Sequence, residues 1–245
     1  MPASGGEDPG TTLRVLHWNV HHGIGTDGVF DLDRIAGWIA RSGANVVSLN
    51  EVDTADMAAA VHSYLEARTG QRWYSAFSGR GNQILTRLAV GNASICPYNA
   101  AAGRNAAHVS AYANGRPINL WSAHLAVDSA GARLSEVYAL QACASSWSEA
   151  RIIAGDFNMQ ASSTEYAAAV SGYQDAWAAA RDAGVTINYS GNCDGCTRNS
   201  RIDYVFRSHG AGFLTLQAAQ MIDTRDGNGS MPSDHKPMLV TYGVN

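Results

Sequence analysis

Short apolar runs typical of β-strands alternate along this chain with segments in which apolar residues recur at helical spacing. Residues 12–20, TLRVLHWNV, are predicted to form a strand. Leu32, Ile35 and Ile39 then fall on one face of a predicted helix, and the preceding Asp31 can cap it. Because strands and helices alternate without a strict β-α-β rhythm, the pattern predicts an α/β (α+β) fold in which helices cover two packed sheets.

The middle of the chain has a different pattern from its two ends. Between residues 72 and 126, Gly and Asn turns separate consecutive strand patterns, which predicts antiparallel hairpins. The remaining predicted strands are 44–52, 72–78, 82–90, 106–113, 116–126, 151–158, 200–208, 213–222 and 236–244, and the remaining helical patterns are 55–69, 130–149 and 163–182.

Length and composition favour one large domain. With 245 residues, of which 46% are hydrophobic, the chain can bury a substantial core. We expect a single domain over residues 12–245, preceded by a disordered, polar tail over residues 1–11. The tail lacks the apolar core of a secretory signal, and we expect any such signal to have been removed already. No run of about 18 apolar residues occurs, so no membrane-spanning helix is expected.

The basic residues exclude several function classes. Net charge is −4, and of the 17 basic residues only Lys236 is a lysine. No lysine-rich stripe is therefore available to grip a nucleic-acid backbone, and no strong basic patch is expected. The same scarcity argues against Schiff-base and phosphate-loop chemistry, both of which need a placed lysine.

Four cysteines bear on the redox environment. Cys193 and Cys196 form the motif CDGC, which could be half of a zinc site, but no second Cys-x-x-Cys exists. We favour a short-loop disulfide there, with free thiols and zinc as the alternatives, and the state of Cys96 and Cys143 stays open. A disulfide favours a secreted or periplasmic location over a cytoplasmic one.

Polar residues stand at or near the ends of the predicted strands. Strand ends at one edge of a sheet sandwich can converge, and carboxylates gathered there would repel one another unless a cation neutralised them. Hard oxygen ligands suit Mg²⁺, with Mn²⁺ or Ca²⁺ as alternatives. Histidines at the same edge are then available for proton transfer. The residues concerned are Asn19, Glu51, His124, Asp156, Asn158, Asp203, Asp234 and His235.

Each of these residues also has an ordinary structural explanation. An aspartate after a glycine usually forms a turn, and a histidine inside an apolar strand is usually a satisfied core residue. Asp203 is harder to explain in this way, because a carboxylate between Ile202 and Tyr204 in a buried strand is costly unless paired. His235 is its natural partner, and the order and spacing of the whole set argue against chance assembly.

Seven short motifs contain these polar residues or stand close to them. They are HWNV (17–20), NEVD (50–53), GNQILTR (81–87), SAHL (122–125), GDFN (155–158), RIDYVF (201–206) and SDHKP (233–237). In this order they resemble the endonuclease/exonuclease/phosphatase superfamily of metal-dependent phosphodiesterases, and the resemblance covers about residues 12–243. It implies a four-layer sandwich of two mostly antiparallel mixed sheets flanked by helices, with the site at one edge.

The resemblance also implies roles for the residues that meet the metal and the phosphate. Glu51 looks like the main metal ligand, with Asn19 and Asp234 near the metal and the phosphate. Asp156 and Asn158 look like the pair that orients the attacking water and the phosphoryl oxygens.

The other three residues resemble the family's proton-transfer groups. Asp203 and His235 resemble the acid and imidazole pair that activates water, in which the acid fixes the ring. His124 looks like the second histidine, which stabilises developing charge or protonates the leaving oxygen. Direct in-line attack by water, without a covalent intermediate, is the expected mechanism.

Two features depart from the family pattern. Secreted deoxyribonucleases place a carboxylate beside the first histidine, shortly after an arginine, whereas here Arg104 is followed by Asn105. The partner of His124 therefore stays open. His21 and His22 stand where some relatives carry an acid that helps to hold metal, and they can contact substrate or cap the turn.

We therefore expect a monomeric, divalent-metal-dependent phosphodiesterase whose natural substrate stays open. DNA or RNA, sphingomyelin or another lipid headgroup, and a small phosphoester cleaved with loose selectivity are the candidates. The stretch SAHL argues against the abasic-site repair branch, and the expected loops 92–104 and 186–200 are small and polar, which argues against membrane insertion. A binding scaffold without activity and a zinc protein are the alternatives from other classes.

Overall fold

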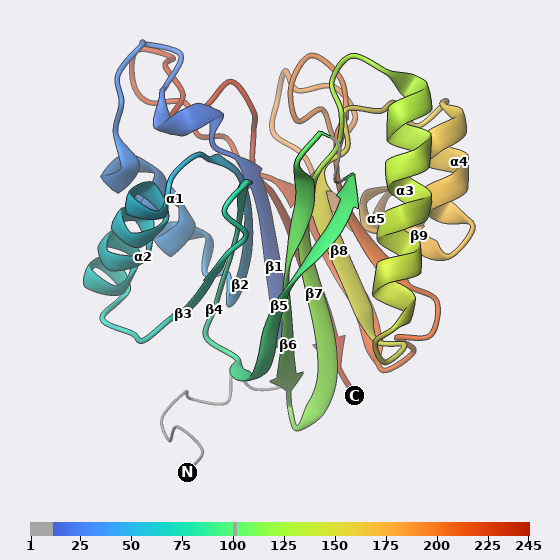
Figure 1. Ribbon diagram of the computed structural model, residues 1–245. Helices are drawn as coiled ribbons and strands as arrows, with labels where there is room; N and C mark the ends of the chain where they lie inside the picture. The colour runs from blue at the N-terminus through green and yellow to red at the C-terminus, as the bar shows by residue number, and fades with distance from the viewer. Residues whose placement is uncertain (1–11, 100–101) are drawn as a thin grey trace.

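The computed structural model describes residues 12–99 and 102–245, so the predicted tail over residues 1–11 lies outside the described residues. Two β-sheets pack face to face, and helices lie on both outer sides (Figure 1). Most neighbouring strands in both sheets are antiparallel. The predicted four-layer α/β sandwich is confirmed, whereas the assignment of residues 12–245 to a single domain stays a prediction.

The first sheet has seven strands in the described chain. They are β1 (Thr12–Asn19), β2 (Val46–Val52), β3 (Tyr74–Phe77), β4 (Gly81–Thr86), β10 (Thr186–Ile187), β12 (Leu214–Met221) and β13 (Met238–Val244), in the order β10-β12-β13-β1-β2-β4-β3. β1 runs parallel to β2 and antiparallel to β13. The ends of β1 and β2 and the start of β13 therefore meet at one edge.

The second sheet has six strands in the described chain. They are β5 (Ala89–Asn99), β6 (Arg104–Ala113), β7 (Arg116–His124), β8 (Arg151–Asp156), β9 (Tyr173–Asp175) and β11 (Asp203–Ser208), in the order β5-β6-β7-β8-β11-β9. β7 and β8 run parallel, and β11 is antiparallel to β8. The ends of β7 and β8 and the start of β11 therefore also share an edge.

Five α-helices in the described chain complete the sandwich. They are α1 (Leu32–Ser42), α2 (Ala55–Thr69), α3 (Ala130–Ser145), α4 (Thr164–Val170) and α5 (Ala176–Asp182). α1 and α2 cover the first sheet, and α3 and α4 cover the second (Figure 1). In α1, Leu32, Ile35 and Ile39 are buried as predicted, because their spacing places them on one face. Asp31 caps the first turn, and Gly43 follows the helix with a φ of 66°.

Some predicted boundaries are wrong. Residues 82–90 do not form one strand, because β4 ends at Thr86 and β5 begins at Ala89 in the other sheet. The expected loop 92–104 lies largely in β5, an edge strand. Only Cys96 and Tyr98 of β5 are buried, so apolar and polar residues alternate too weakly for the sequence to predict a strand there. The helical pieces predicted over residues 163–182 are α4 and α5, but the short strand β9 between them was not predicted.

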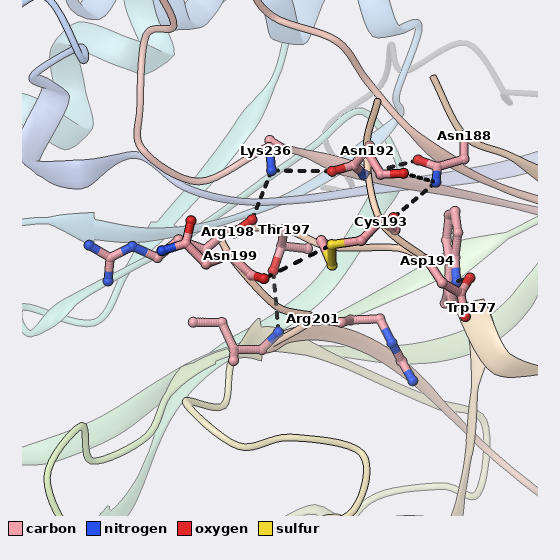
Figure 2. The surroundings of a disulfide bond; sticks show 12 residues. Trp177, Asn188, Asn192, Cys193, Asp194, Thr197, Arg198, Asn199, Arg201 and Lys236 are labelled. Carbon is pink, nitrogen blue, oxygen red and sulfur yellow. Dashed lines mark hydrogen bonds between the residues drawn. A yellow bond between two sulfur atoms is a disulfide. The ribbon is translucent and has the colours of Figure 1, made fainter. Parts of the chain in front are cut away.

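The four cysteines form two disulfides. Cys96–Cys143 joins β5 to α3, and Cys193–Cys196 closes the CDGC turn, as favoured from the sequence. Lys236 holds the loop around this second disulfide, since its Nζ donates to Asn192 Oδ1 at 3.2 Å and to the Arg198 carbonyl at 2.8 Å (Figure 2). No helix in residues 12–99 or 102–245 is both long and apolar enough to cross a membrane.

Candidate active site

Side chains from both sheets meet at the edge where β1, β2, β7 and β8 end. Asn19 is the last residue of β1, and Glu51 is the residue before the end of β2. His124 and Asp156 end β7 and β8 and stand opposite each other in the parallel pair. Asp203 opens β11 and faces Asp156 in the antiparallel pair. The strand directions alone therefore gather residues that are far apart in the sequence.

Asn19 links two of the gathered carboxylates. Its fully buried Nδ2 donates to Glu51 Oε1 at 2.8 Å and to Asp156 Oδ2 at 3.1 Å, which uses both amide hydrogens. Its Oδ1 accepts the His21 amide at 3.0 Å, and its carbonyl accepts the Ser233 hydroxyl at 2.7 Å. Asn19 thereby fixes the spacing between the acids of the two sheets.

Asp203 and His235 form a buried ion pair. His235 Nδ1 lies 2.9 Å from Asp203 Oδ2, and both side chains are at most 5% exposed. Burial lowers the pKa of His235, but the charge of Asp203 and this hydrogen bond outweigh it and raise the pKa to about 9. Burial also opposes the charge on Asp203, yet His235 and His17 hold the pKa of Asp203 far below its ordinary value. The pair is therefore charged in the structure.

Asp156 stands between two imidazoles. Its Oδ2 lies 3.8 Å from His124 Nε2 and 3.8 Å from His235 Nε2. Burial, reinforced by the negative charge of Asp203, raises the pKa of Asp156 to about 7. Burial lowers the pKa of His124 to about 4, although the charge of Glu51 acts in the opposite direction. Burial is therefore the main cause of both shifts.

The backbone of His124 is held by two side chains. The Tyr98 hydroxyl accepts the His124 amide at 3.1 Å and donates to the His124 carbonyl at 2.6 Å. Arg104 Nη1 also donates to that carbonyl, at 3.0 Å. Among the described residues, Asp156 is the one carboxylate within 4.0 Å of the His124 ring, so the partner left open by the sequence is not supplied from β6.

Strained backbone is concentrated at this edge. Four of the five non-glycine residues with positive φ in the described chain are here, namely His21, His22, Glu51 and Asn158. Such conformations cost about 1–3 kcal/mol each and persist where the surrounding structure enforces them. At Asn158 the amide donates to Asp156 Oδ1 at 2.9 Å, and its side chain donates to the Leu125 carbonyl at 3.1 Å.

The two adjacent histidines have different contacts. His22 Nε2 lies 3.1 Å from Glu51 Oε2, and its Nδ1 lies 2.8 Å from Asp53 Oδ2. His21 Nδ1 instead bonds to the Ile24 carbonyl within the turn at 2.9 Å. Of the two roles left open, His22 reaches the site and His21 supports the turn.

Asp234 connects the site to the CDGC loop. Arg198 Nη2 lies 2.6 Å from Asp234 Oδ2, and the hydroxyl of Thr197, next to Arg198, accepts the Asp203 amide at 3.2 Å. The Lys236 amide donates to the Thr197 carbonyl at 2.6 Å, and this bond joins the CDGC loop to the segment that contains His235. The other oxygen, Asp234 Oδ1, is buried without a hydrogen-bond partner in the described chain.

Sequence reasoning gave no role to His17 or Tyr98, which contact Asp203 and His124. For His17 a signal existed, because a strand places residues i and i+2 on one face and His17 stands two before Asn19. The sequence gives no comparable signal for Tyr98, because residues 92–104, which include it, were predicted to form a loop. Arg198 lies outside the seven motifs, and only the folded loop brings it to Asp234.

A cavity of about 700 Å³ opens beside Glu51 and His124. Its lining is mostly polar and includes both signs of charge. The acidic, basic and histidine side chains in the lining are those of His22, Glu51, Asp53, Arg80, Arg104, His124, Asp128 and Glu136. Tyr98 is the one aromatic residue in the lining, and it is 7% exposed.

The sequence matches the Endonuclease/Exonuclease/phosphatase family over residues 16–235, which is most of the chain. The chain belongs to this family. Endonuclease/exonuclease/phosphatase members hydrolyse phosphoesters, so the chain is an enzyme and a hydrolase, as expected. No curated protein gives a significant match to the sequence.

Solved structures share the fold. An endonuclease/exonuclease/phosphatase family protein from Bacteroides thetaiotaomicron has a TM-score of 0.77 at 17% identity, over 96% of this chain and 98% of the other. The mannosyl-6-phosphatase of the same species has a TM-score of 0.75 at 18% identity, over 93% and 98%. D. rerio TDP2, solved with a single-strand DNA product, has a TM-score of 0.73 at 19% identity, over 96% and 100%.

Members of the endonuclease/exonuclease/phosphatase family depend on a divalent metal ion, and the residues at this edge fit one. Ligand atoms of Asp156, Asp203 and His235 lie within 4.8 Å of one another. Asp234 Oδ1 is a buried acceptor without a partner in the described chain, and the negative charge of Asp203 adds to burial in raising the pKa of Asp156. Oxygen donors dominate the set, as hard cations require.

Proposed function

We propose that this hydrolase is a divalent-metal-dependent phosphodiesterase that uses water activated by the Asp203–His235 pair. The observation that carries the proposal is that Nε2 of His124 and Nε2 of His235 are each 3.8 Å from Asp156 Oδ2. Two imidazoles thus converge on Asp156, and one of them, His124, lines the cavity. Hydrolysis by in-line attack needs a base for the water and an acid for the leaving oxygen, and two converging imidazoles can supply both.

His235 is the proposed base. Asp203 accepts its Nδ1–H. Because a pKa of about 9 favours the protonated ring, His235 acts as the base once Nε2 has released its own hydrogen, and Nε2 then receives a proton from water. The same carboxylate stabilises the imidazolium that forms. The hydrogen bond to the buried Asp203 holds the His235 ring in one orientation, so the ring does not have to reorient during the reaction.

His124 is the proposed group on the leaving-oxygen side. It borders the cavity, and Tyr98 and Arg104 hold its backbone from the β5 and β6 side. A protonated Nε2 there can donate to the leaving oxygen or stabilise the charge that develops on it. Asp156, with Asn158 bonded to its other oxygen, orients the water and the phosphoryl group.

Glu51, Asn19 and Asp234 are the residues proposed to hold the metal. Mg²⁺ suits this oxygen set, with Mn²⁺ and Ca²⁺ as alternatives. When bound, the cation stabilises negative charge on the nonbridging oxygens. Asn19 spaces Glu51 from Asp156 through its two donated hydrogen bonds, so both carboxylates keep a fixed direction.

The cavity favours a compact, polar leaving group. Its one Phe, Tyr or Trp side chain, Tyr98, is buried and already bonded to His124, so the lining offers no exposed ring of these three residue types on which a base could stack. Acids and arginines in the lining instead match hydroxyl and charged groups. The two disulfides support the proposed secreted or periplasmic location.

A lipid-headgroup diester is the second candidate. Val29 and Phe30 are 52% and 58% exposed in the loop that follows His22, and Val127, three residues after His124, is 64% exposed. Exposed apolar side chains beside a polar site can rest on a lipid surface while the headgroup enters. The expected loop 92–104, which argued against membrane contact, does not include these residues.

The test is hydrolysis of bis(p-nitrophenyl) phosphate by chelator-treated protein to which Mg²⁺, Mn²⁺, Ca²⁺ or Zn²⁺ is returned in turn. Metal-dependent release of nitrophenol that fails in His124→Ala and His235→Ala would support the proposal. p-Nitrophenyl phosphate, single-stranded DNA, RNA and sphingomyelin vesicles then rank monoester, nucleic-acid and lipid substrates. Turnover of none of these with any of the metals would refute the proposed function.

A further inference from the structure

A second histidine contacts Asp203 on the oxygen that His235 does not use. His17 Nε2 lies 3.0 Å from Asp203 Oδ1, and His235 Nδ1 lies 2.9 Å from Asp203 Oδ2. The side chains of His17 and Asp203 are each 1% exposed. Asp203 is therefore enclosed between two imidazoles, of which the proposed mechanism uses only one.

The direction of the hydrogen bond follows from the acceptor. An ionised carboxylate can only accept, so His17 Nε2 must carry a hydrogen and donate it. His17 Nδ1 lies 3.1 Å from Ser48 Oγ, and Ser48 Oγ lies 2.9 Å from Ser122 Oγ. Both nitrogens of the ring are thus engaged, and the ring cannot turn without losing two buried hydrogen bonds.

The same chain of buried hydrogen bonds, which forms a polar layer between the sheets, extends to Asp156. Asn50 Nδ2 lies 3.3 Å from Ser122 Oγ, and Asn50 Oδ1 accepts the Asp156 amide at 2.8 Å. His17, Ser48, Ser122 and Asn50 come from β1, β2 and β7, so the layer spans both sheets beneath the site. Burial of so many polar groups between two sheets is costly unless their hydrogen bonds are satisfied, as they are here.

We propose that His17 is a positioning residue for the reaction, acting through Asp203. This inference rests on the proposed function. By holding Oδ1, His17 fixes the carboxylate plane so that Oδ2 faces His235 Nδ1. Without that bond, Asp203 Oδ1 is a buried charged oxygen with no side-chain donor in the described chain, and the carboxylate turns to share His235 between its two oxygens.

The expected effect is on turnover rather than on substrate binding. Residues that orient a reacting group through a hydrogen bond typically contribute about 10- to 100-fold. His17→Leu should therefore lower kcat by about 10- to 100-fold while KM changes less than about twofold. His17→Gln, which keeps a nitrogen donor near the position of Nε2, should recover most of the loss.

His108 supplies the matched control. It is also fully buried in a strand, β6, and both its nitrogens are bonded, to Ser94 Oγ at 2.8 Å and to Asn119 Oδ1 at 3.1 Å. It touches none of the proposed catalytic residues. His108→Leu should lower the stability, as His17→Leu does, but leave kcat unchanged. All rates are compared per folded protein, with folding checked by thermal unfolding.

A second measurement does not depend on activity. In the metal-free protein, the ¹⁵N and ¹H resonances of the His235 imidazole report its hydrogen bond to Asp203. They should shift in His17→Leu, return towards the wild-type values in His17→Gln, and stay unchanged in His108→Leu. An active wild type whose His17→Leu variant keeps kcat would overturn the inference. If the wild type hydrolyses no phosphoester, the proposed function fails, and unchanged His235 resonances in His17→Leu would then reject the positioning role separately.

Discussion

Removal of the Cys96–Cys143 disulfide should lower both stability and turnover. The bond joins the edge strand β5 to α3 and closes a loop with a sequence separation of 47. Two residues after Cys96, the Tyr98 hydroxyl holds the amide and the carbonyl of His124. The disulfide therefore restrains the unfolded chain and, in the folded chain, anchors the segment that positions His124.

The size of the stability effect follows from loop-closure entropy. For a separation of 47 the entropic model gives about 4 kcal/mol at 25 °C, and for the separation of 3 at Cys193–Cys196 it gives about 1.6 kcal/mol. In a chain of this length, about 4 kcal/mol corresponds to a fall in Tm of roughly 8–16 °C. Loss of the buried Cys96 sulfur adds a smaller packing term.

Urea unfolding of Cys96→Ala/Cys143→Ala and of Cys193→Ala/Cys196→Ala, each against the wild type, measures the two effects. The first variant should lose about 2 kcal/mol more than the second, as the difference between the two loop lengths requires. Its kcat on bis(p-nitrophenyl) phosphate should also fall. Equal losses in the two variants, or a larger loss from opening the CDGC turn, would refute the entropic reasoning.

Three further predictions concern single residues. A Cβ added to Gly155 would lie 2.0 Å from the Ala123 carbonyl oxygen, so Gly155→Ala should destabilise the fold by about 3 kcal/mol or more. In the control variant Gly131→Ala, in α3, the added Cβ meets no atom closer than 3.9 Å, so this change should be neutral or stabilising. Chemical unfolding of both variants measures the difference in stability. Glu51→Gln should raise the Mg²⁺ concentration needed for half-maximal activity and weaken Mg²⁺ binding in calorimetry; an unchanged metal response would remove it from the proposed ligands. His235→Ala should lower kcat by about 10² to 10⁴, the usual scale for a general base, and a fully active variant would contradict that role.

Local sequence determined the layers and the polar strand ends of this protein. Helical spacing in α1 and apolar runs such as RIIAG report burial directly, because each element must bury one face on its own. GDFN ends a buried strand with polar groups, and Gly155 is required because the Ala123 backbone of β7 passes against it. β5 was not predicted as a strand, because an edge strand buries few of its side chains and so has a weak apolar pattern.

Only the tertiary structure decided which groups meet. Asp203 lies 186 residues from His17 in the sequence, and Arg198 reaches Asp234 from the CDGC loop. Contacts of this kind depend on strand order and direction across two sheets and on the hydrogen bonds of Lys236 to the loop, neither of which has a local signal in the chain. The CDGC motif favoured the disulfide in this loop but not the contact of the loop with Asp234. The sequence by itself therefore determined which polar residues end the strands. The packing of the sheets and loops decided that His17, Tyr98 and Arg198 contact Asp203, His124 and Asp234, because long-range packing alone sets the distance between side chains.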